Sequence, residues 1–232
     1  MKDKTSITQL DRVSSIVDLG VTLDEKLNFS EHLHAKIRKA YSMIGIIKRN
    51  FKYLSVSCFI MLFKCMVRSH LDYCNSVWAP YRKSDIDDLE KVQRRATKIV
   101  PALSKLTYEE RLKRCGLTTL KFRRIRGDMI ETFKILTGKY DTSVAPHFSL
   151  STFKKTRGND YKINTARPHY DLRKYFFTNR VVNIWNSLPN DIVKSSTTNQ
   201  FKNKLDKFWE NQEIIFNYKT DLTGIGSRSE FC

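Results

Sequence analysis

A helical pattern runs through Leu89-Glu90-Lys91-Val92-Gln93-Arg94-Arg95-Ala96-Thr97-Lys98. Apolar residues recur at spacings of three and four from Ile86 to Ile99, which is the period of an amphipathic α-helix. The other side is basic, with Lys91, Arg94, Arg95 and Lys98. Three acids precede the run, where negative charge suits a helix N-terminus: Asp85, Asp87 and Asp88. The sequence therefore predicts a two-sided helix from Ser84 to about Val100.

The same period extends in both directions along the chain. It starts at Ser30, a candidate N-cap, and continues through a strongly apolar segment at 56–71, which predicts a helix in the centre of a bundle. Thr107-Tyr108-Glu109-Glu110 has the pattern of a capping box, and Gly116 and Gly138 suit helix ends. Further helices are predicted over 119–137, 171–188 and 198–209.

Three segments lack this period. Residues 16–23 are rich in β-branched and aliphatic residues and predict one or two short strands, which could not form a closed sheet alone. Residues 139–165 predict a loop-rich junction, and the tail after Thr220 is expected to be disordered. The prediction is a mainly α fold. It comprises a β remnant in 1–28, a helical bundle in 29–138 and a small, basic, α-rich region in 139–232.

The composition is strongly basic. Lys and Arg number 42 against 24 Asp and Glu, a net charge of +18, while 41% of residues are hydrophobic. Such a surplus in a folded chain favours polyanionic partners, and a merely solvated basic surface is the alternative. The longest apolar run, Cys58 to Phe63, is far below the ~20 residues that span a bilayer. The absence of a signal-like N-terminus and of paired cysteine spacings predicts an intracellular protein, nuclear or cytoplasmic, with reduced thiols.

The charge is clustered. From Lys91 to Arg126 there are 12 basic and two acidic residues, and from Lys154 to Arg180 there are eight and two. Basic stripes opposite apolar stripes can contact phosphates without reading bases. The candidate nucleic-acid-binding residues are Lys91, Arg94, Arg95, Lys98, Lys121, Arg123, Arg124, Arg126, Arg173 and Lys174.

Other patterns have structural explanations that compete with functional ones. Aromatic residues interleave with the second basic cluster and could stack on bases, but helical spacing predicts that most are core: Tyr161, Tyr170, Tyr175, Phe176 and Phe177. The acids at 85–88 superficially resemble a polymerase aspartate pair, yet their place at a helix start favours a dipole role. Cys58, Cys65, His70 and Cys74 lack the close spacing of a zinc site. We identify no catalytic residue and no metal ligand.

Several blocks, taken in order, resemble a known family. His70-Leu71-Asp72-Tyr73-Cys74-Asn75-Ser76-Val77-Trp78, followed by the 89–98 helix, resembles the segment downstream of the palm in reverse transcriptases of non-LTR retrotransposons, namely LINE elements of the jockey-like and chicken-repeat-like branches. The blocks at 19–27, 108–128 and 172–189 are similar to the flanking regions in the same order. The resemblance covers about residues 13 to 210.

The resemblance implies a non-catalytic part of an RNA-directed DNA polymerase. Residues 29–138 would be the thumb and adjoining helices, which hold primer and template by their backbones. The chain lacks the endonuclease and the palm aspartates, so no cofactor is expected in it; Mg²⁺ belongs to the palm of the intact polymerase. The implied partners are RNA, DNA or RNA–DNA hybrid, with possible association with the missing polymerase half and none with a membrane. Activity as an enzyme on its own is not expected. A domesticated or decayed module that binds proteins is the alternative.

Overall fold

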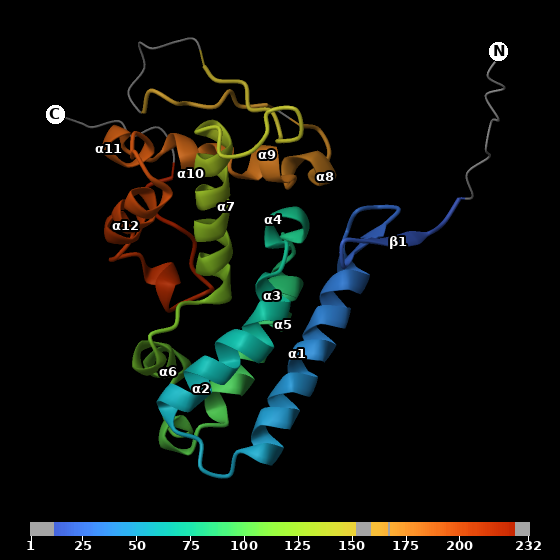
Figure 1. The fold of residues 1–232 in the computed structure, drawn as a ribbon, viewed down its shortest axis with the longest axis vertical. Helices are drawn as coiled ribbons and strands as arrows, with labels where there is room; N and C mark the ends of the chain where they lie inside the picture. The colour runs from blue at the N-terminus through green and yellow to red at the C-terminus, as the bar shows by residue number, and fades with distance from the viewer. Residues whose placement is uncertain (1–11, 152–158, 167, 226–232) are drawn as a thin grey trace.

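The chain folds as a set of helices with one small sheet. A computed structural model describes residues 12–151, 159–166 and 168–225. The fold is mainly helical, as predicted (Figure 1). The longer helices are α1 (Ser30–Asn50), α5 (Lys83–Lys98), α6 (Tyr108–Cys115), α7 (Leu120–Leu136) and α12 (Thr198–Phe208). The capping box at Thr107 and the left-handed Gly116 that ends α6 are both confirmed.

A β-hairpin precedes the helices. Strands β1 (Ser15–Asp18) and β2 (Val21–Asp24) pair antiparallel, which confirms the predicted strands. All four residues of β1 are exposed. The carboxylate of Asp24 accepts hydrogen bonds from the backbone N–H groups of Asn28 (3.0 Å) and Phe29 (2.6 Å). Phe29, in a left-handed conformation, is therefore the N-cap of α1, and the prediction of Ser30 as the N-cap is wrong.

The apolar segment after α1 is helical but not uniformly α. It consists of α2 (Val56–Leu62), a π-helical stretch η1 (Phe63–Arg68) and α3 (Ser69–Asp72). Phe59, Phe63, Val67 and Leu71 are each 0% exposed and lie four residues apart. A spacing of four exceeds the 3.6 residues of an α turn, and the wider π winding keeps these side chains on one side. The segment has an exposed side, with Met61 at 63%, so the expectation of a central helix is wrong.

The buried side chains form two clusters that meet at the start of α7. The first extends from Val21 to Leu120 and is built by α1, α5 and the segment at 56–72. The second begins at Phe122 and includes Phe133, Trp185 and Phe201. The clusters therefore divide at the start of α7 rather than at 138. Because α7 belongs to both, it fixes the C-terminal region against the N-terminal bundle.

The predicted helix over 171–188 is wrong. The chain forms three short helices there, α8 (Asp171–Lys174), α9 (Phe177–Arg180) and α10 (Val182–Asn186), before α11 (Asn190–Val193). Tyr175 stacks on Tyr81, with ring centroids 4.3 Å apart, whereas Phe177 is buried in the second cluster. Phe176, between these two residues in the sequence, has an extended backbone conformation. Farther on, the side-chain amide of Asn159 donates hydrogen bonds to the carbonyl of Trp185 in α10 and to that of Leu188 beyond it, so a side chain supplies a donor to these buried carbonyls. Residues 139–151 and 159–165 contain no helix, consistent with the predicted junction.

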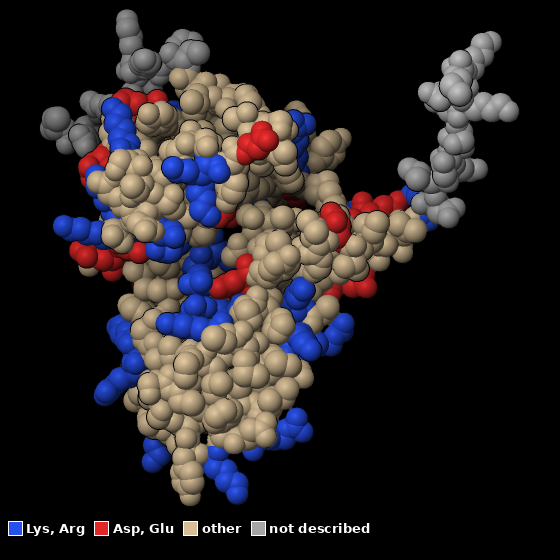
Figure 2. Space-filling view, in the orientation of Figure 1, with Lys and Arg blue, Asp and Glu red and all other residues tan. Residues whose placement is uncertain are grey.

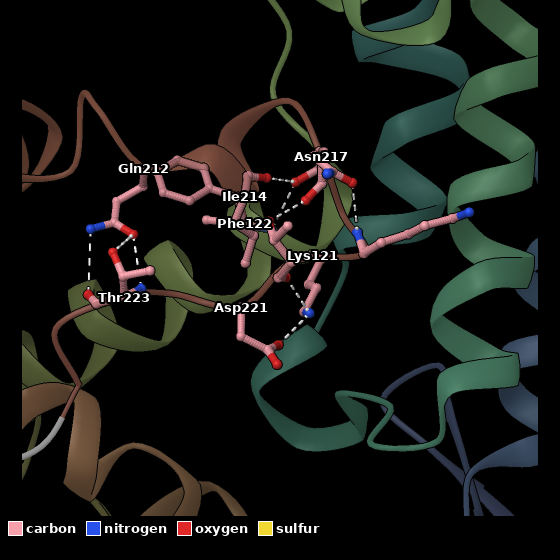
Figure 3. A network of polar contacts seen from close by, with 10 residues as sticks. Lys121, Phe122, Gln212, Ile214, Asn217, Asp221 and Thr223 are labelled. Carbon is pink, nitrogen blue, oxygen red and sulfur yellow. Dashed lines mark hydrogen bonds and ion pairs between the residues drawn. The ribbon is translucent and has the colours of Figure 1, made fainter.

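The C-terminal segment is ordered beyond Thr220. After η3 (Glu213–Ile215), the chain crosses the first turn of α7, where Lys121 donates to the carbonyl of Thr220 and pairs with Asp221 (Figure 3). Gln212 accepts hydrogen bonds from the backbone and hydroxyl of Thr223. Leu222 is 7% exposed and joins the second cluster. The expected disorder is therefore wrong for residues 221–225, and residues 226–232 lie outside the described chain.

A buried carboxylate joins three helices. Glu90 of α5 is 0% exposed and accepts hydrogen bonds from the Tyr108 hydroxyl of α6 and from the backbone N–H of Leu120 (3.0 Å) at the start of α7. The side-chain amide of Gln93 donates to the same carboxylate. Burial raises the pKa of Glu90, and the nearby cation of Arg124 opposes that rise. Glu90 thus satisfies one of the orphan donors at the N-terminus of α7.

The remaining short elements are α4 (Asn75–Trp78) and η2 (Pro101–Leu103).

We predict that Glu90→Ala lowers the free energy of unfolding by about 3 kcal/mol or more, because it leaves buried donors without an acceptor and removes the anion that most favours the charge of Arg124. Urea denaturation measures the loss. Glu109→Ala is the control, since Glu109 forms an exposed ion pair with Lys113, worth about 0.5 kcal/mol. Equal losses in the two variants would contradict this role for Glu90.

Candidate nucleic-acid interface

The basic side of α5 is exposed along its length. Lys91, Arg94, Arg95 and Lys98 are all exposed, whereas Val92 and Ala96 are buried at 0%. Residues three and four apart share one helix face, so these four cations form a continuous row. The structure therefore brings together the first four predicted site residues on one surface, which we name the α5 row.

Most of the α5 row carries no carboxylate partner. Lys91 is paired with Asp88 at 2.7 Å, and both side chains are substantially exposed. Arg94 lies 5.7 Å from the ring centroid of Tyr108, and Arg95 lies 5.5 Å from that of Tyr41. Among the residues that the structure describes, no acidic side chain forms an ion pair with Arg94, Arg95 or Lys98. Their charges are therefore available to a ligand.

A groove borders the α5 row on the side of α1. It has a volume of about 400 Å³. Its lining is Tyr41, Ile44, Gly45, Lys48, Arg95, Lys98 and Ile99. Three of these residues are cations and none is an acid. Lys48 is absent from the predicted site, although it lies in an acid-free basic run; the period of α1, which places it one turn beyond Ile44 on the side that meets α5, could have indicated it.

The basic residues of α7 are bound by acids instead. Lys121 pairs with Asp221, and Arg126 pairs through two nitrogens with Asp206. Arg123 pairs with Asp72 at 2.5 Å, and Arg68 reaches the same carboxylate at 3.6 Å. Figure 2 shows basic side chains gathered across the middle of the molecule, near the start of α7, with acidic atoms among them. A phosphate at this surface would compete with these aspartates.

Arg124 is inside the protein. Its side chain is 5% exposed, and burial lowers its pKa against the opposing effects of Glu90, Asp72 and Asp128. Its Nη2 atom has no hydrogen-bond partner within the described part of the chain. The prediction of Arg124 as a surface phosphate contact therefore needs correction, because the guanidinium is enclosed where α5 and α7 meet.

Arg180 forms an internal ion pair that the sequence did not indicate. It donates two hydrogen bonds to Asp128, at 2.9 and 3.0 Å, and one to the carbonyl of Ser76 at 2.7 Å. Burial raises the pKa of Asp128, and Arg180 opposes that rise. This ion pair is structural and joins α9 to α7 and α4.

The last two predicted site residues lie apart from α5. Arg173 and Lys174 are exposed in the four-residue helix α8, and Lys174 lies 5.3 Å from the ring centroid of Tyr175. The expectation that the neighbouring aromatics are mostly core is wrong. Only Phe177 is buried, and Tyr170 is 79% exposed. Much of the basic cluster from Lys154 onward lies outside the described residues.

The described ranges offer no metal centre. Within residues 12–151, 159–166 and 168–225, no group of three or more His, Cys, Asp or Glu side chains is placed to hold a metal ion. Asp85 lies in the first turn of α5, where its negative charge favours the helix N-terminus. Asp88 forms an ion pair with Lys91 of the α5 row. In the same part of the chain, no helix combines the length and apolar character that crossing a membrane requires.

Two adjoining apolar cavities open on another part of the surface. The larger, of about 680 Å³, is lined by α4, the end of α7 and the loop that follows it. The smaller, of about 230 Å³, lies between α4, α8 and the segment that connects β2 to α1. Val77 and Phe176 line both cavities and are 49% and 55% exposed.

The chain has a distant relative among known proteins. The chain is 25% identical to "Uncharacterized protein B0403.1" of Caenorhabditis elegans over 182 residues, which cover 73% of this chain and 92% of that protein. No family model and no solved structure matches the chain.

We predict opposite roles for two arginines. Arg124→Ala should lower the free energy of unfolding by about 3 kcal/mol, because it removes the buried cation that offsets the charge of Glu90, whereas Asp128 keeps its ion pair with Arg180. Arg95→Ala should change it by less than about 0.5 kcal/mol, because this side chain is exposed. Thermal and urea unfolding of the two variants check the assignment. A near-neutral Arg124→Ala would show that this guanidinium is not structural.

Proposed function

We propose that this chain is a non-catalytic part of a LINE-type RNA-directed DNA polymerase and that it binds RNA, DNA or RNA–DNA hybrid through backbone phosphates. The observation that carries the nucleic-acid part is the α5 row, in which three of four exposed cations have no carboxylate partner among the described residues. The order of the sequence blocks from 19 to 189 supports the polymerase origin.

The geometry of the α5 row favours phosphate contacts over base recognition. Long cationic side chains on one exposed helix face can follow a phosphate backbone, and such contacts position a protein without reading sequence. Each phosphate neutralised releases counterions, so affinity should fall steeply with salt. The net charge of +18 would add long-range attraction. We therefore propose binding that is mostly independent of sequence.

Association with the missing polymerase half remains part of this proposal. All four residues of β1 are exposed, and isolated two-stranded hairpins are marginal in water. A further strand supplied by the preceding part of the polymerase would extend this sheet. The chemistry of nucleotide addition, with its Mg²⁺, would lie in that half.

The alternative function is a helical module that binds proteins. It is favoured by the two apolar cavities that share Val77 and Phe176. Binding through such a surface would depend weakly on salt and would not need the α5 row. Salt dependence therefore distinguishes the two proposals.

We predict that replacing Arg94, Arg95 and Lys98 together with Ala weakens binding to RNA, duplex DNA and hybrid alike. The slope of log affinity against log salt should fall in magnitude by roughly 2–3 for duplex DNA, since each lost phosphate contact removes about 0.9. Fluorescence titration over a salt series measures both quantities.

The matched control replaces Lys26, Lys202 and Lys207 with Ala, which removes the same charge from the segment between β2 and α1 and from α12. This variant should keep most of the affinity. If both triple variants lose affinity equally, the effect is one of net charge, and the α5 row is not the interface.

A further inference from the structure

Gly45 lies in the interior of α1, where glycine is unfavourable. A glycine in a helix interior is destabilising by roughly 0.5–1 kcal/mol relative to alanine. An added Cβ at Gly45 would meet no other atom of the described residues within 4 Å, so packing among these residues does not require a glycine here. The open space above Gly45 belongs to the groove beside the α5 row. The glycine therefore keeps the floor of this groove bare.

The groove is built to accept an anion. Tyr41, Gly45 and Lys48 recur at helical spacing on α1, and Arg95 and Lys98 come from α5. These three cations all lie in the last turns of their helices. Each helix C-terminus contributes about −0.5 of a charge, so two of them offset only about one of the three positive charges. A net positive potential remains over the bare backbone of Gly45.

We propose that this groove binds one phosphodiester of a nucleic-acid strand directly over Gly45, with Lys48, Arg95 and Lys98 as its cationic contacts. The inference rests on the proposed function and adds to it a specific location and a residue, Lys48, on α1. The absence of a side chain at Gly45 allows the strand to approach the helix backbone closely. Alternatively, these three cations only stabilise the C-terminal ends of α1 and α5. That structural role does not require an open groove beside them.

The test fills the groove without changing charge. Gly45→Leu should weaken binding of a single-stranded oligonucleotide by roughly tenfold, the equivalent of one lost charge-assisted contact. Ser42→Leu is the matched control, because Ser42 is exposed on the same helix and does not line the groove. Gly45→Ala should raise Tm by roughly 2–4 °C, because alanine is the better helix former. Such a rise would show that folding does not require glycine at residue 45.

The outcomes separate the inference from the proposed function. Full affinity in a folded Gly45→Leu variant, beside a wild type that binds, overturns the groove and leaves nucleic-acid binding intact. No binding by the wild type at low salt overturns both. Titration with inorganic pyrophosphate distinguishes a strand from a free phosphate. If Gly45→Leu loses pyrophosphate but keeps the oligonucleotide, the groove binds a small anion and the proposal of a strand fails.

Discussion

The buried carboxylate of Glu90 is the constraint on which the helix arrangement depends. It accepts the Leu120 N–H that begins α7 and the hydroxyl of Tyr108 in α6, and Arg124 lies nearby as its countercharge. A buried anion without these partners would be strongly unfavourable, so the three helices must meet at this point. With the inner side of α5 fixed in this way, its basic side is directed outward. The exposure of the basic side chains is thus a consequence of the buried carboxylate on the opposite side of α5.

The positive charge is divided between two roles. The arginines of α7 and α9 meet Asp72, Asp128 and Asp206, which makes them part of the join between the two core clusters. The α5 row and Lys48 have few such partners. A large net charge alone therefore does not locate an interface. The distribution of carboxylates does, since no carboxylate of the described residues pairs with Arg95 or Lys98 and would compete with a phosphate there.

Local rules predicted the local structure well. The period of α5, the capping box at Thr107 and the hairpin at 15–24 follow from neighbours a few residues apart, and the structure confirms each. The errors arise where distant residues decide. Arg123 and Arg180 find their aspartates 51 and 52 residues away, and the contact of Tyr175 with Tyr81 interrupts the expected helix at 171–188. One local signal was available for Arg124, because Asp128 follows it by one helical turn.

The most direct measurement of the central claim is amine labelling of the lysines in the presence and absence of a bound oligonucleotide, read out by mass spectrometry. The account predicts that bound nucleic acid reduces labelling at Lys48, Lys91 and Lys98 and leaves Lys26 and Lys207 unchanged. Protection that is uniform over the chain, or that excludes α1 and α5, would contradict an interface built on the outer side of α5.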